Sequence, residues 1–197
     1  MTARITRRGA LALGIALVAA GAIAAVIVAF AVPGGSQFPQ LTPRAAPAAW
    51  RQVMLPNGTA VLSYPPSLRP VHSDKGAASV ARLSPSGTYV VYLNATPRQG
   101  DETLRNWATF RVNLLRADHA ASAHEVSAAQ GVRFRGGSGS CVIDDYVTRI
   151  GAHHYEELAC LAQGRTGASV VVAAALASQW ATAQPMLEQA VAAYALR

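Results

Sequence analysis

The side chains with chemical potential gather in one short stretch of the chain, between residues 141 and 160. Two cysteines bound this stretch, and acidic residues and histidines lie between them. Carboxylates and imidazoles can act as general acids and bases or ligate a metal ion. The candidate cluster consists of Asp144, Asp145, His153, His154, Glu156 and Glu157.

The two cysteines, Cys141 and Cys160, are the only cysteines of the chain. Outside the cytoplasm such a pair usually forms a disulfide. Zinc is the alternative, because two histidines lie between the cysteines, but the spacing matches no standard zinc module. We therefore predict a Cys141–Cys160 disulfide, which leaves Cys160 without the thiolate that a nucleophile needs.

The cysteine spacing also predicts an antiparallel hairpin. If Cys141 lies directly opposite Cys160, the turn falls at Ile150-Gly151, which suits a two-residue loop. Directly opposed residues have a Cα distance that a disulfide can bridge. Closing a loop of about 20 residues stabilises a fold by about 3 kcal/mol in the chain-entropy account.

The same register opposes like charges. Asp144 faces Glu157 and Asp145 faces Glu156, and opposed carboxylates destabilise a sheet. A bulge, side chains turned into water, or a bound cation such as calcium would each relieve the repulsion. Strand residues alternate in direction, so the two pairs lie on opposite faces and the four carboxylates are split. We expect a solvated acidic rim and no metal site.

No catalytic motif accompanies this cluster. The sequence has no serine in a nucleophile elbow and no His-Glu-x-x-His motif. Paired carboxylates on strands are common without catalysis. The formal charge of +7 raises the question of nucleic acid, but the basic residues are scattered singly and no aromatic residues interleave with them. We predict a non-enzymatic protein that binds no nucleic acid and no cofactor.

An uncharged run of 24 residues, 9–32, stands near the start of the chain. It is long enough to cross a hydrocarbon core of about 30 Å as a helix. The positive-inside rule places residues 1–8 in the cytoplasm and the rest outside. We predict an uncleaved signal anchor in the plasma membrane; the alternative is a signal peptide cleaved after Ala29-Phe30-Ala31. The arginines that set the orientation are Arg4, Arg7 and Arg8.

A linker and one domain follow the anchor. Residues 33–49 are rich in proline and glycine and predict an extended spacer. Residues 50–197 are enough for one domain with its own core. Alternating and helical hydrophobic patterns predict strands at 53–55, 59–64, 77–83, 88–94, 124–128, 131–135, 141–150, 153–162 and 168–176, and helices at 101–116 and 183–196.

Several short motifs stand at defined places in this order of elements. They are Leu55-Pro56-Asn57-Gly58, Ser63-Tyr64-Pro65-Pro66-Ser67-Leu68, Thr88 to Leu93, Val171 to Leu176, and Trp180 with Leu187. With them, residues 50–197 resemble the PsbP-like domain family, although Leu68 stands where the family often has tryptophan. The resemblance implies an α+β fold, an antiparallel β-sheet with two packed helices, which here follows the N-terminal transmembrane helix.

The resemblance implies a binding or assembly role and carries over no functional residue. We therefore predict a single-pass, membrane-anchored, extracytoplasmic module of the bacterial cell envelope that works with an envelope protein partner. One alternative is an extracytoplasmic sensor that binds a lipid or a sugar, which a deep apolar pocket between helix and sheet would favour. The other is a small hydrolase built on the acidic hairpin.

Overall fold

The computed structural model describes residues 37–197. The predicted membrane anchor, residues 9–32, lies outside the described residues. Within residues 37–197, none of the helices combines the length and the apolar character that a membrane span requires.

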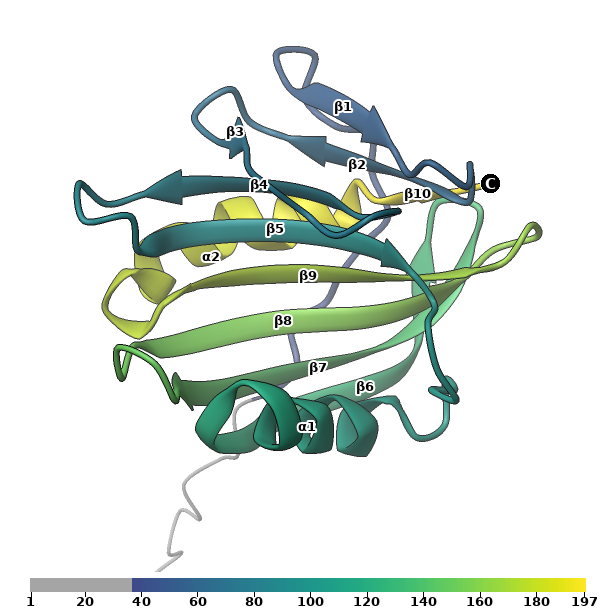
Figure 1. The fold of residues 1–197 in the computed structure, drawn as a ribbon. Helices are drawn as coiled ribbons and strands as arrows, with labels where there is room; N and C mark the ends of the chain where they lie inside the picture. Colours follow the sequence, from purple (N-terminus) through teal and green to yellow (C-terminus); the bar gives the residue numbers. More distant parts are fainter. Residues whose placement is uncertain (1–36) are drawn as a thin grey trace, which may run out of the picture. The chain divides into compact units, whose positions relative to one another are not determined.

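A seven-stranded antiparallel sheet forms the centre of the domain (Figure 1). Its strands lie in the order β3-β4-β5-β9-β8-β7-β6, so β9 is inserted between strands that come earlier in the chain. The strands are β3 (Arg69–Pro70), β4 (Ala78–Leu83), β5 (Tyr89–Pro97), β6 (Ala120–Phe134), β7 (Gly137–Thr148), β8 (His154–Gln163) and β9 (Ala168–Leu176).

A small three-stranded sheet and two helices complete the domain. The small sheet contains β1 (Arg51–Met54), β2 (Ala60–Tyr64) and β10 (Ala195–Leu196). The helices are α1 (Trp107–Asp118) and α2 (Ala177–Ala192), which lie on opposite faces of the large sheet (Figure 1). The predicted α+β class, with an antiparallel sheet and two packed helices, is confirmed for the described residues.

Strand alternation divides the large sheet into two apolar layers. On one face, residues of β5, β7, β8 and β9 form the main core with α2, and Leu158, Ala173 and Leu187 are fully buried there. On the other face, Trp107 of α1 packs on a smaller cluster and its Nε1 donates to the Ala159 carbonyl at 2.9 Å. The second half of α1 packs elsewhere, because Val112 and Leu115 contact Ala120 and Ala123 of β6. Part of the sheet face at β5 and β9 is therefore not covered by α1 (Figure 1).

The two strands predicted at 124–128 and 131–135 are one strand, β6. Gly131 adopts φ +69° and the register shifts between Gln130 and Val132, so this glycine sits in a bulge and not in a turn. The strand predicted at 141–150 begins earlier, at Gly137, so most of the glycine-rich segment after Arg135 belongs to β7. Gly139 is needed in that strand, because a Cβ there would lie 2.5 Å from the Leu161 carbonyl oxygen.

Both helices have different bounds from those predicted. Asp101 does not cap α1, because buried Glu102 accepts hydrogen bonds from the backbone N–H groups of Gln99 and Gly100 and holds this segment as a loop. The predicted helix 183–196 starts earlier, at Ala177, and includes Pro185 in its interior. Its predicted end belongs to β10, which pairs with β2.

The packed region also begins before Trp50. Phe38 and Leu41, from the predicted linker, pack against the main core, and the Arg44 N–H donates to the Ala192 carbonyl at the end of α2. This part of the proline-rich segment therefore lies on the domain and does not act as a free spacer.

Candidate functional site

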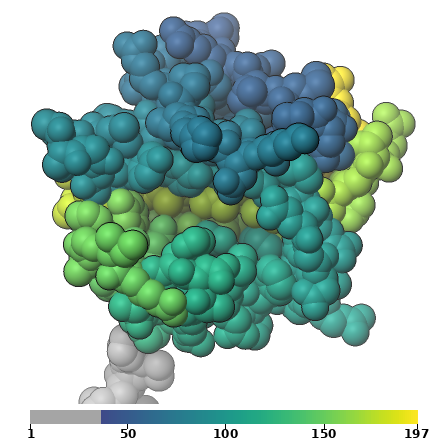
Figure 2. Space-filling model, viewed as in Figure 1, coloured from purple at the N-terminus to yellow at the C-terminus, as the bar shows by residue number. Residues whose placement is uncertain are grey.

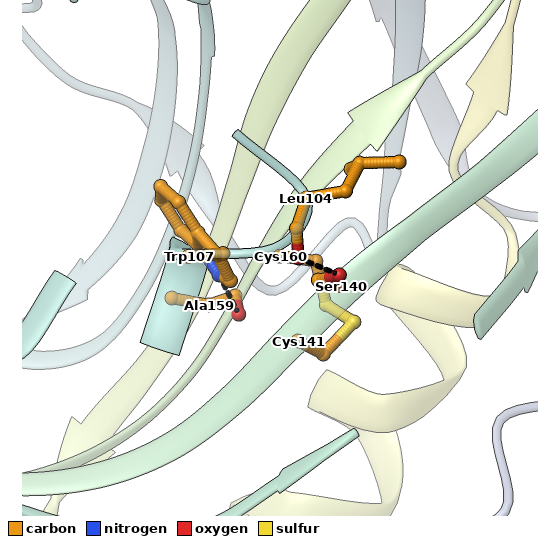
Figure 3. Close-up of a disulfide and its surroundings, with 6 residues drawn as sticks. All are labelled: Leu104, Trp107, Ser140, Cys141, Ala159 and Cys160. Carbon is orange, nitrogen blue, oxygen red and sulfur yellow. Dashed lines mark hydrogen bonds between the residues drawn. A yellow bond between two sulfur atoms is a disulfide. The ribbon is translucent and has the colours of Figure 1, made fainter. Parts of the chain in front are cut away.

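The cysteine hairpin has the predicted register. Cys141 lies opposite Cys160 with a Cα–Cα distance of 4.0 Å, and the two form a disulfide (Figure 3). The predicted two-residue loop is wrong, because β7 ends at Thr148 and β8 begins at His154. The Thr148 N–H donates to the His153 carbonyl and the Thr148 hydroxyl donates to the Ile150 carbonyl, and these hydrogen bonds stabilise a wider turn.

The opposed pair Asp144 and Glu157 is buried, so the predicted solvated rim is wrong here. The two residues are 0% and 1% exposed and lie on the α1 face of the sheet. A cation relieves their repulsion, and it is the guanidinium of Arg111 from α1. Its Nε and Nη2 both lie 2.6 Å from Glu157 Oε1. The positive charge that compensates these buried carboxylates therefore comes from α1, the helix packed on this face of the sheet.

The remaining members of the predicted cluster lie elsewhere. Asp145 and Glu156 also oppose each other, but on the other face and partly exposed. His154 Nε2 lies 3.4 Å from an Asp145 oxygen, and His153 belongs to the turn, where its N–H donates to the Thr148 hydroxyl. Within residues 37–197, no three potential metal-ligating side chains come together.

Asp144 is a buried acid without a hydrogen-bond partner in the part of the chain that the structure describes. Burial and the negative charge of Glu157 together raise the pKa of its carboxyl to about 9, although the positive charge of Arg111 opposes the shift. Asp144 is therefore a neutral acid at neutral pH, whereas Glu157 is the partner of Arg111. The three groups together carry no net charge.

This raised pKa makes folding stability depend on pH. The folded chain keeps the Asp144 proton up to about pH 9, whereas the unfolded chain loses it near the ordinary pKa of 3.8. The unfolded state therefore binds fewer protons between these values, and stability falls as pH rises. We expect Asp144→Asn to be more stable than the wild type at pH 8, by at least about 1 kcal/mol, and equal to it near pH 4. Urea denaturation at the two pH values measures this, and a pH-independent difference would contradict it.

A cleft opens beside α1, over the part of the sheet that the helix leaves uncovered. Its volume is about 650 Å³. Figure 2 shows the hollow, with β9 visible at its floor between α1 and the segment that carries β4 and β5. We call it the tyrosine cleft. It is lined by Asp74, Tyr89, Tyr92, Asn94, Arg111, Leu115, Asp118, His119, Tyr146, Thr148, Arg149, Ile150, Tyr155, Glu157, Val172 and Ala174.

Four tyrosines give the cleft its character. The rings of Tyr146 and Tyr155 stack at 5.5 Å between centroids, and those of Tyr89 and Tyr92 lie tilted at 5.3 Å. The Tyr155 hydroxyl donates to the Tyr89 carbonyl at 2.8 Å, which ties β8 to β5 across β9. Burial raises the pKa of Tyr92, Tyr146 and Tyr155, so these phenols remain protonated.

Sequence reasoning found Glu157 but not the cleft that it lines. The sequence predicts residues 88–94 as a strand without indicating a site on it. The available signal was alternation, since Val91 and Leu93 are buried while Tyr92 and Asn94 on the other face are only partly buried. That face would be covered in a sheet packed on both sides, but here α1 lies over β6 and β7.

The fold and the cleft define a class of protein, an antiparallel α+β domain with an open concave site on one sheet face. No protein-family model matches the sequence, and no curated protein matches it. Solved structures with a similar backbone include the cyanobacterial PsbP, CyanoP, of Synechocystis sp. PCC 6803, with a TM-score of 0.49 and 12% identity over 77% of this chain and 95% of that one.

Two further solved structures are similar at the same low level. One is PA94 of Pseudomonas aeruginosa, a protein of unknown function, with a TM-score of 0.45 and 11% identity over 72% of this chain and 92% of that one. The other is LpqN of Mycobacterium tuberculosis, described as involved in cell envelope biogenesis, with a TM-score of 0.38 and 13% identity over 77% and 80%. None of them transfers a residue role to this chain.

Proposed function

We propose that the chain is a membrane-anchored, non-enzymatic binding module of the bacterial cell envelope and that the tyrosine cleft is its binding site. In this proposal, residues 9–32 form the anchor and the domain lies outside the plasma membrane. The PsbP-like family is the proposed relation, and it rests on the motifs of the sequence and on the α+β architecture described above.

The observation that carries the proposal is the cleft itself. Small-molecule sites are concave, largely preformed and built from apolar and aromatic walls with a few polar groups. The tyrosine cleft has this composition, with Val172 and Ala174 on its floor and the Arg111–Glu157 ion pair at one side. A concave site of about 650 Å³ favours a small ligand over the flat contact of two proteins.

The polar side of the cleft is also held rigidly. Arg111 is anchored on Glu157, and Arg149 donates hydrogen bonds to the carbonyls of Ala117 and Ala120, both at 3.1 Å. Groups that are already fixed lose little entropy when a ligand binds. The cleft therefore supports binding without large rearrangement of α1.

Crosslinking in intact cells tests the proposal. A photocrosslinking amino acid replaces Tyr89 on the cleft rim in one full-length chain and Val126 on β6 in another. Tyr89 and Val126 are 40% and 39% exposed, so a difference between their adducts reflects where they lie and not how accessible they are. We expect mass spectrometry to find a non-protein adduct from position 89 alone. A protein adduct in its place would favour the assembly role, and no adduct from position 89 would refute a cleft ligand.

A further inference from the structure

Acidic residues are concentrated around the tyrosine cleft in a chain that is basic overall. The chain has a formal charge of +7 and only ten acidic residues. Asp74, Asp118 and Glu157 line the cleft, and Asp144 and Glu125 continue from Glu157 across β7 and β6 in register. Half of the acidic residues therefore lie at or beside one site. Because Asp144 is neutral and Glu157 is paired with Arg111, the carboxylates left to receive positive charge are Asp74 and Asp118 of the lining, with Glu125 beside it.

The two arginines of the cleft are already engaged. Arg111 is paired with buried Glu157. Arg149 donates to carbonyls at and just beyond the carboxyl end of α1, including that of Arg116, where the negative end of the helix dipole lies. Among the ion pairs of residues 37–197, neither includes Asp74 or Asp118. The charges of Arg111 and Glu157 cancel, and Asp74 and Asp118 together outweigh Arg149, so the lining keeps a formal net charge of −1 with His119 neutral.

The tyrosine rings add a second and independent preference. An aromatic face carries a negative quadrupole and attracts a cation within about 6 Å of the ring centroid. Four such rings line the cleft, and Tyr92, Tyr146 and Tyr155 remain neutral because burial raises their pKa. Metal ions need several converging oxygen or nitrogen ligands, whereas an organic cation can bind against rings with a carboxylate nearby.

We infer that the tyrosine cleft binds an organic cation, an amine or quaternary ammonium group that contacts the tyrosine faces and lies near Asp74 and Asp118. This inference rests on the proposed function, because it names the ligand class of the same site. The volume of about 650 Å³ leaves room for an attached group larger than the ammonium itself.

Calorimetric titration of the full-length chain in a non-ionic detergent tests the inference. The probes are choline and 3,3-dimethylbutan-1-ol, which has the same shape without the charge. We expect choline to bind at least about tenfold more tightly, as desolvated cation–π contacts predict. Equal affinity for choline and the uncharged alcohol overturns the inference and leaves the cleft a binding site. Absence of choline binding also overturns the inference. It does not decide the proposed function, which the crosslink from position 89 tests separately.

Matched variants test whether the preference for a cation arises from residues of the cleft. Asp118→Asn and Tyr89→Leu are each expected to weaken choline binding about threefold to tenfold. Asp101→Asn removes the same charge from an exposed site outside the cleft lining, and Tyr89→Phe keeps the aromatic face, so both should bind choline as the wild type does. Equal losses in Asp118→Asn and Asp101→Asn, or in the two Tyr89 variants, would overturn the inference.

Discussion

Replacing Arg111 with methionine is expected to destabilise the domain by about 3–5 kcal/mol at neutral pH. Methionine keeps much of the length of the side chain but removes the guanidinium that lies 2.6 Å from Glu157 Oε1. Glu157 is 1% exposed and Asp144, directly opposite, is 0% exposed, so the remaining carboxylate is buried without a partner. Urea denaturation of the full-length chain in detergent measures the loss.

A double variant separates the charge effect from lost packing. In Arg111→Met with Glu157→Gln, no buried charge is left uncompensated, and we expect most of the lost stability to return. Glu157→Gln alone should be destabilising, because it leaves the buried guanidinium without its carboxylate. A loss below about 1 kcal/mol in Arg111→Met, or no recovery in the double variant, would contradict the role given to the ion pair.

Removing the disulfide has the second largest expected effect. Replacing both Cys141 and Cys160 with alanine should destabilise the domain by about 2–4 kcal/mol, because the unfolded chain is no longer closed into a loop. Using alanine at both positions avoids an unpaired thiol. The bond joins adjacent strands beneath α2 and its cysteines are 1% and 0% exposed. Thermal and urea unfolding of the double variant measure the loss.

The burial of this disulfide makes a control available. Because reductant reaches it only when the domain opens, the native wild type should resist a mild reductant while the urea-unfolded wild type is reduced. Unfolding of the reduced wild type should then coincide with that of the double alanine variant. Equal stability of the oxidised wild type and the double variant would show that the bond is not a structural constraint.

The sequence specified the local pairing of this hairpin well. Two cysteines and an Ile150-Gly151 turn were enough to place Asp144 opposite Glu157, because the register of an antiparallel pair follows from one fixed pair. The same reasoning failed on exposure. Arg111, which allows these carboxylates to be buried, lies in a different element 46 residues away from Glu157. No local pattern identifies such a long-range partner.

Helix bounds were predicted less well, for a different reason. The hydrophobic pattern predicts a helix from residue 101, but the buried Glu102 accepts hydrogen bonds from the preceding backbone and the helix begins at Trp107. Pro185 was expected near a helix start, yet α2 extends from Ala177 because its apolar residues pack on the sheet. Tertiary packing outweighed the local signal in both helices.

The tyrosine cleft could not be predicted because it depends on strand order. Tyr92, Tyr146 and Tyr155 come from β5, β7 and β8, and they meet only because β9 is inserted between β5 and β8. Alternation along each strand indicates which residues share a face but not which strands are neighbours. The position of α1 over β6 and β7, which leaves that part of the face open, is likewise a property of the folded chain.

The most direct test of a functional cleft is to fill its floor and measure the crosslink from position 89. Ala174 lines the cleft and is 2% exposed, so the phenyl ring of Ala174→Phe should occupy the cleft. If phenylalanine disturbs folding, Ala174→Leu is used in its place, because leucine is smaller. Ala128→Phe on exposed β6 is the matched control. We expect the filled floor to abolish the non-protein adduct and the control variant to retain it. An undiminished adduct in a folded Ala174 variant would contradict a functional cleft.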